Sequence, residues 1–224
     1  MRTGVFAQIP VKADLRMSKF FSADNPFNRF MYKLGCFILV NIYFLVCSIP
    51  VVTIGASLTA ANFVCYKMKE EPDVKITSVF FRTFASNFLN STLVWIIFAG
   101  IMSALVYGIV WSVSVSGNMA VCVACAIGTI IAGAGGTYVF MLIARYKNTI
   151  MTHILNGFKV GFANLAWTLL IWLVWAVPIL FFLSVPGALL YMGWIWLLCG
   201  FSLLIYVTSG IYKHIFSKLE KKED

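Results

Sequence analysis

Three long segments without a charged side chain constrain the fold more than any other feature of this sequence. They run through Leu34–Tyr66, Thr83–Ala144 and Val160–Tyr212. Each is much longer than the roughly 18 apolar residues that indicate one membrane-spanning helix. Because 61% of the residues are hydrophobic and only 11% are charged, a soluble core of this size could not bury them. We therefore expect an integral membrane protein built as an all-α, polytopic helical bundle.

The first of these segments is too long for one crossing of a membrane. As a single helix, Leu34–Tyr66 would be about 50 Å long, whereas the hydrocarbon core of a bilayer is about 30 Å thick. Pro50 can interrupt it, because proline breaks helical hydrogen bonding, and Gly55 follows shortly after. We predict two helices, about 26–48 and 54–70, which either cross the membrane twice or form a re-entrant hairpin with the same parity.

The basic residues indicate which loops face the cytoplasm, where Lys and Arg in short loops are favoured. If the first segment crosses twice, all 17 Lys and Arg residues fall on one side, whereas a single crossing divides them between both sides. We therefore expect one membrane domain, residues 1–224, with about six spans in three hairpins and both termini in the cytoplasm. Residues 1–25 would form a cytosolic or interfacial arm. The predicted spans are about 26–48, 54–70, 91–113, 119–144, 165–184 and 188–210.

An internal repeat is visible in two segments of the chain. Residues 81-FRTFASNFLNSTLVW-95 align without gaps with 158-FKVGFANLAWTLLIW-172, and a helix rich in small residues precedes each copy. The predicted unit is a descending helix, a cytosolic amphipathic helix and an ascending helix. Apolar residues recur at helical spacing in 74–88 and 149–163, which we predict to be the amphipathic helices. Such duplication is typical of transporters, although inert scaffolds also show it.

The basic residues also indicate the surroundings of the protein. Arg82 and Lys159 occupy equivalent positions in the two copies, where we predict that they bind lipid phosphates while their apolar neighbours insert. The other basic residues are scattered beside apolar segments instead of forming one surface. The net charge of +9 therefore favours membrane lipids, and not nucleic acid, as the partner.

Few residues suggest chemistry. The long apolar segments lack the Asp, Glu, Lys or Arg that usually mark an ion path or a proton relay. His153 and His214 both lie in predicted cytosolic segments, and no zinc-protease, paired-carboxylate or serine-nucleophile motif is present. Cys122 and Cys125 form a CxxC pair, but lipid burial keeps a thiol protonated and inert. We expect neither an enzyme nor a metal or cofactor site.

Five polar residues lie inside predicted apolar helices. Such side chains most often form hydrogen bonds across helices, and a site for a substrate is the alternative interpretation. The five candidates are Asn41, Thr53, Thr59, Asn62 and Thr137.

Small residues at every fourth position give the fourth predicted span a smooth face. Small side chains allow another helix backbone to approach closely, so we expect this face to pack inside the bundle. The alternative is a docking surface for a partner protein. The face consists of Ala120, Ala124, Gly128, Ala132 and Gly136.

Two blocks of sequence carry a resemblance to a known family. These blocks are 24-DNPFNRFMYKLGCFILVNIYFLVCSIPVVTIGASLTA-60 and 80-FFRTFASNF-88, and the later hydrophobic hairpins follow in the same order. The chain resembles the YesL-like family of bacterial integral membrane proteins, which is classed as domain of unknown function 624. The resemblance implies a bacterial plasma membrane and an ancillary role in carbohydrate uptake, with permease or sensor subunits of an ABC-type sugar importer as partners.

Three hypotheses for the function are consistent with these observations. The first is a non-catalytic membrane protein that is accessory to ABC-type carbohydrate uptake or its sensing. The second is a self-contained small permease or channel for a neutral solute, which the repeat and the polar first hairpin favour. The third is a lipid-responsive scaffold that acts through its basic amphipathic helices.

Overall fold

The computed structural model describes residues 26–71 and 73–220, and the predicted arm, residues 1–25, lies outside them. The chain divides into two compact units, Met1–Cys36 and Phe37–Asp224. The described part of the first unit is the beginning of helix α2, and the core lies within the second unit. All regular secondary structure in the described residues is helical, which confirms the expected all-α fold.

The first hairpin bends around Pro50. Helix α2 (Pro26–Cys47) ends just before this residue, and a short 3-10 turn, η1 (Val51–Thr53), leads directly into helix α3 (Ile54–Lys67). The hydroxyl of Thr53 donates to the carbonyl oxygens of Cys47, at 2.6 Å, and Pro50, at 2.7 Å. The bond to Cys47 provides a partner for a carbonyl at the end of α2, and the Pro50 carbonyl also accepts from the Thr53 N–H at 2.9 Å.

Helix α3 is short for a membrane span. Its 14 residues would extend over about 21 Å, which is less than the thickness of a hydrocarbon core. Its side chains are nevertheless buried, because small residues let the neighbouring helices α4, α5 and α9 approach it closely. Of the six predicted spans, the one at about 54–70 is therefore not long enough to cross as a straight helix.

Five helical segments are long and apolar enough to cross a membrane. Many of their apolar side chains are exposed, including Val113 at 70%, Leu183 at 78% and Leu190 at 85%. Apolar surface of this extent is typical of contact with lipid. The chain is therefore a multi-pass membrane protein. The five candidate spans are Phe30–Cys47, Ile76–Ser116, Met119–Arg145, Leu165–Ser184 and Ala188–Lys218.

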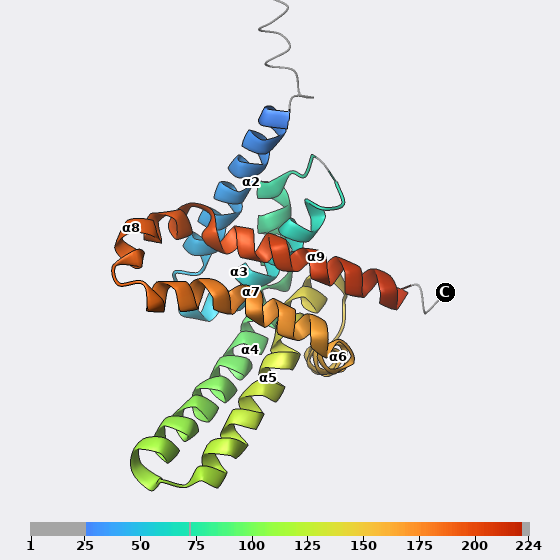
Figure 1. The fold of residues 1–224 in the computed structure, drawn as a ribbon. Coiled ribbons are helices and arrows are strands. Elements are labelled where there is room, and N and C mark those ends of the chain that lie inside the picture. The colour runs from blue at the N-terminus through green and yellow to red at the C-terminus, as the bar shows by residue number, and fades with distance from the viewer. Residues whose placement is uncertain (1–25, 72, 221–224) are drawn as a thin grey trace, which may run out of the picture. The chain divides into compact units, whose positions relative to one another are not determined.

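The second hairpin consists of two long helices that lie side by side (Figure 1). Helix α4 (Ile76–Trp111) has 36 residues and continues into a π-helical turn, η2 (Ser112–Ser116). It joins the predicted amphipathic segment 74–88 and the predicted span 91–113 in one continuous helix. Gly117 then adopts a φ of 61°, and the side chain of Asn118 accepts from the Ala120 N–H at 3.1 Å. This turn ends η2 and caps helix α5 (Met119–Arg145).

The last third of the chain begins with a separate amphipathic helix. Thr149 caps helix α6 (Ile150–Ala163), and the non-helical backbone of Asn164, with a φ of −127° and a ψ of 46°, separates α6 from helix α7. Gly187, with a φ of 79°, forms the turn to the final hairpin arm, in which α7 and α9 lie side by side (Figure 1). The remaining elements are α7 (Leu165–Ser184), α8 (Ala188–Ile195), the π-helical turn η3 (Trp196–Gly200) and α9 (Phe201–Glu220).

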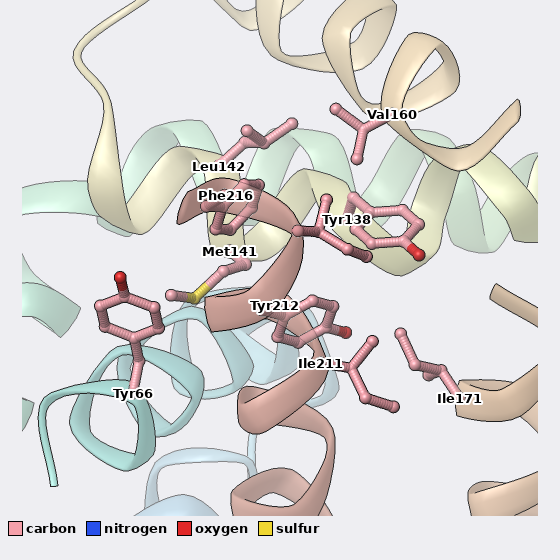
Figure 2. Close-up of a cluster of buried hydrophobic side chains, with 10 residues drawn as sticks. Tyr66, Tyr138, Met141, Leu142, Val160, Ile171, Ile211, Tyr212 and Phe216 are labelled. Carbon is pink, nitrogen blue, oxygen red and sulfur yellow. The ribbon is translucent and has the colours of Figure 1, made fainter. Parts of the chain in front are cut away.

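A cluster of buried side chains connects five helices, α3, α5, α6, α7 and α9 (Figure 2). Tyr138 of α5 and Tyr212 of α9 pack edge to face, with ring centroids 5.6 Å apart. Aromatic pairs of this geometry add to the stabilisation from burial alone. The cluster consists of Tyr66, Tyr138, Met141, Leu142, Val160, Ile171, Ile211, Tyr212, Ile215 and Phe216.

Helices α5 and α6 approach each other through glycine. A Cβ atom added at Gly161 would lie 2.5 Å from the carbonyl oxygen of Ala134, and one added at Gly157 would lie 2.8 Å from that of Gly135. The side chain of Phe158, between the two glycines, packs in turn against Gly135. The amphipathic helix is thus held against the backbone of α5, which fixes the position of the loop between them.

Candidate functional site

Asn41 is fully buried and bonds to the distant η3 turn. Its Nδ2 donates to the carbonyl oxygens of Trp196, at 3.0 Å, and Leu197, at 2.7 Å, and its Oδ1 accepts from the Ser202 N–H at 3.0 Å. A π-helical turn disrupts the regular ladder and leaves backbone groups that need partners. The Asn41 amide provides these partners, so it connects α2 to the last helical hairpin.

Thr59 has a similar linking role between α3 and α4. Its Oγ1 donates to the Gly55 carbonyl at 2.8 Å and lies 2.9 Å from the Oγ of Ser91, and all three residues are buried. Thr53, as described above, closes the turn at Pro50. Asn41, Thr53 and Thr59 therefore each form hydrogen bonds within the protein.

The other two candidates, Asn62 and Thr137, line one small cavity between α3, α5, α7 and α9. Its volume is about 170 Å³, which is below the range of about 300 to 1,000 Å³ that is typical of small-molecule sites. Asn62 Nδ2 donates to the Leu58 carbonyl at 2.9 Å. The cavity therefore has room for a small solute or a few water molecules.

The polar groups around Thr137 are bonded to one another. Thr137 Oγ1 donates to the Gly133 carbonyl at 2.8 Å and accepts from Trp172 Nε1 at 2.9 Å. The Tyr212 hydroxyl donates to the Thr137 carbonyl at 2.9 Å. Trp175 and Phe140 also line the cavity, so two tryptophans, a tyrosine and a phenylalanine form its aromatic wall.

The remaining predicted residues lie apart from this cavity. Arg82 and Lys159 are both exposed, as binding to lipid phosphate would require, and that binding remains a prediction. On α5, Gly128 packs against Leu105 and Gly136 against Phe98, both of α4, and Ala132 is buried. Ala120 and Ala124 are exposed, so the small-residue face packs within the hairpin along only part of its length.

A comparison with family models identifies part of the chain. Residues 37–109 match the model of a family described as a protein of unknown function, DUF624. The match confirms the predicted resemblance, since the YesL-like family is a member of DUF624. No curated protein and no solved structure matches the chain.

The DUF624 segment ends within α4 and so contains the first copy of the internal repeat. The second copy lies outside it but has equivalent contacts. A Cβ atom added at Gly55 would meet the side chain of Trp95, and one added at Gly133 would lie 3.0 Å from the ring of Trp172. In both copies, therefore, a glycine of the small-residue helix packs against the tryptophan that ends the aligned segment.

Thr208 and Tyr212 were not among the predicted site residues, although both line the small cavity. They lie four residues apart on α9 and share one helix face, which is the signal that could have identified them. Among the described residues, no group of three or more His, Cys, Asp or Glu side chains is arranged to hold a metal ion.

Proposed function

We propose that this protein is a non-catalytic membrane protein that is accessory to ABC-type carbohydrate uptake or its sensing in a bacterial plasma membrane. The observation that carries the proposal is that buried polar side chains form hydrogen bonds between helices of the protein itself. The amide of Asn41 and the hydroxyl of Thr59 both bond within the protein and hold helices together. A catalytic site needs convergent polar groups that remain available to a substrate, so this arrangement favours a structural role.

The DUF624 match and the distribution of charge support the rest of the proposal. The resemblance to the YesL-like family suggests the permease or sensor subunits of a sugar importer as partners. If the first hairpin returns the chain to the side of the membrane where it began, all 17 Lys and Arg residues lie on that one side. This arrangement favours cytoplasmic termini. Cytoplasmic loops would then be available to the cytoplasmic parts of an importer.

The proposal is tested by crosslinking in native membranes. A photo-reactive residue replaces Ala124, which is exposed on α5, or Ala132, which is 7% exposed on the same face. The chain carries a tag at the C-terminus, and crosslinked proteins are identified by mass spectrometry. We expect to recover importer permease or sensor subunits in every replicate when the photo-reactive residue is at position 124 or when a general crosslinker is used. No importer subunit should be recovered when the photo-reactive residue is at the buried position 132. Recovery of only the protein itself would contradict the proposal.

A second candidate function is a small permease for a neutral solute, which the cavity around Asn62 and Thr137 favours. Trp172 and Trp175 could stack on a sugar ring there, and the amide of Asn62 could bind a hydroxyl group. Purified protein in liposomes would then transport a neutral sugar, and Asn62→Leu would reduce the flux about tenfold. Asn156→Leu, at a half-buried position of α6, is the control. No flux from a broad panel of sugars would exclude this function.

A further inference from the structure

A second and larger cavity lies apart from the small cavity and from the five polar candidates. Its volume is about 650 Å³, and it lies between the first half of α4, the end of α5, the loop that follows α5 and the first turn of α6. The polar side chains that matter for its chemistry are Asn87, Asn90, Arg145, Lys147, Thr149 and His153. Unlike the small cavity, it is large enough for a typical small-molecule ligand.

The charges around this cavity have one sign. Arg145 and Lys147 line it, and no carboxylate is among its lining residues. Arg145 is held in place, since its Nη1 donates to the Tyr66 hydroxyl at 2.6 Å and its guanidinium lies 5.5 Å from the ring of Phe216. Lys147 is exposed at the edge of the cavity. The site therefore favours an anion.

Helix α6 begins in the wall of the cavity. Thr149 is its N-cap residue, and its Oγ1 accepts from the Thr152 N–H at 3.4 Å. The first N–H groups of a helix have no partner within the helix, and the helix dipole adds partial positive charge at the same end. With 14 residues, α6 is long enough for this effect, which favours phosphate groups.

A buried histidine provides an independent indication of a ligand. His153 lines the cavity, its side chain is only 1% exposed, and its Nδ1 is buried without a hydrogen-bond partner. Helical side chains lean toward the N-terminus of their helix, and this direction brings the imidazole toward the start of α6. An unpaired buried polar atom costs about 1–3 kcal/mol, so its persistence here is explained if a ligand supplies the partner.

The imidazole also indicates what kind of group the ligand carries. Burial lowers the pKa of His153, while a hydrogen bond with the Asn148 backbone opposes this shift, so the net effect favours the neutral imidazole. A neutral imidazole has one donor and one acceptor nitrogen. Nδ1 can therefore donate to a phosphate oxygen in one tautomer or accept from a hydroxyl group in the other.

We propose that this cavity binds a phosphate ester whose organic part carries hydroxyl groups. The phosphate lies at the first turn of α6, between Arg145 and Lys147. The hydroxyl groups face Asn87 and Asn90 of α4, whose amides can both donate and accept. This chemistry is shared by soluble polyol or sugar phosphates and by the headgroups of glycerol-based anionic lipids. The inference does not depend on the accessory function proposed above.

Binding is measured with the full-length chain in two kinds of nanodisc. In the first arm the lipid is phosphatidylcholine alone, and glycerol 3-phosphate or glucose 6-phosphate is titrated, with glucose as the probe that lacks phosphate. In the second arm phosphatidylglycerol is added to the bilayer, and its residence at the protein is followed by native mass spectrometry. The variants are Lys147→Gln and Asn90→Ala, and Lys75→Gln is the matched control, since Lys75 is exposed just before α4 and does not line the cavity.

We expect phosphate esters to bind in one of the two arms and glucose not to bind. Lys147→Gln should weaken binding about tenfold, because it removes a charged hydrogen-bond donor, whereas Lys75→Gln should leave binding unchanged. Binding in the first arm identifies a soluble ester, and binding only in the second identifies a lipid headgroup. Absence of binding in both arms, or equal losses in Lys147→Gln and Lys75→Gln, would overturn the proposal.

Discussion

Gly161→Ala is expected to lower the stability of the protein by about 2 kcal/mol or more, although alanine normally stabilises a helix relative to glycine. The added Cβ would lie 2.5 Å from the carbonyl oxygen of Ala134 and 2.9 Å from its carbonyl carbon. Both atoms belong to the backbone of α5, so no side-chain rotation can relieve the clash. The two helices must separate, and the packing between α5 and α6 is lost.

The measurement is the thermal unfolding of the purified protein in detergent, with Gly100→Ala as the matched control. Gly100 lies within α4, and a Cβ atom added there would have no neighbour within 4 Å. The control should therefore melt at the parent temperature or above, since helix propensity favours alanine by about 1 kcal/mol. If Gly161→Ala were as stable as Gly100→Ala, the close approach of α5 and α6 would be incorrect.

Asn41→Leu is expected to have the second large effect. Leucine has a similar volume but cannot bond to the Trp196 and Leu197 carbonyls or to the Ser202 N–H. Each buried group left without a partner costs about 1–3 kcal/mol, although hydrogen bonds between membrane helices average only about 0.6 kcal/mol. We expect a total loss of about 2 kcal/mol, with loosening of the η3 turn.

Unfolding in increasing mole fractions of dodecyl sulfate measures this loss, with Asn156→Leu as the control. Asn156 is half-buried on α6, so its replacement should change the unfolding midpoint little. Cysteine accessibility adds a local readout, because Cys199 lies within η3 and its labelling rate should rise in Asn41→Leu. Equal midpoints and equal labelling rates in the two variants would contradict the linking role of Asn41.

The hairpin turns are the part of the fold that sequence reasoning could predict best. Pro50 cannot donate a backbone hydrogen bond, and Gly117 and Gly187 adopt positive φ values that other residues disfavour. These effects are local, so the residues themselves determine where the helices end. The long apolar segments were equally informative, because the width of a bilayer sets how many residues one span requires.

The continuity of α4 is less visible in the sequence. Asn87 and Asn164 are equivalent in the repeat, and each donates from Nδ2 to the carbonyl four residues earlier, at 3.1 Å in both cases. Asn87 nevertheless remains inside α4, whereas Asn164 has a φ of −127° and ends α6. The same residue type with the same local bond therefore adopts two backbone conformations, and tertiary packing decides between them.

The two cavities also depend on tertiary packing, so the sequence alone could not predict them fully. The sequence indicated that Asn62 and Thr137 were buried polar residues, but that the two line one cavity depends on how α3 packs against α5. The larger cavity was harder to foresee, because Asn87 and Asn90 become neighbours of His153 only through the packing of α4 beside α5 and α6. The role of a single polar residue can be assigned only when the residues that pack around it are known.

The bond between Asn41 and η3 also affects how the protein is made. The acceptors of the Asn41 amide lie 155 and 156 residues later in the chain. Translation at about 5–20 residues per second means that they are synthesised roughly 8–30 s after Asn41. During that interval the first hairpin has entered the membrane with its amide still unbonded to its final partners. The hydrogen bonds of the first helix to be inserted are therefore among the last to form, because they require the final hairpin.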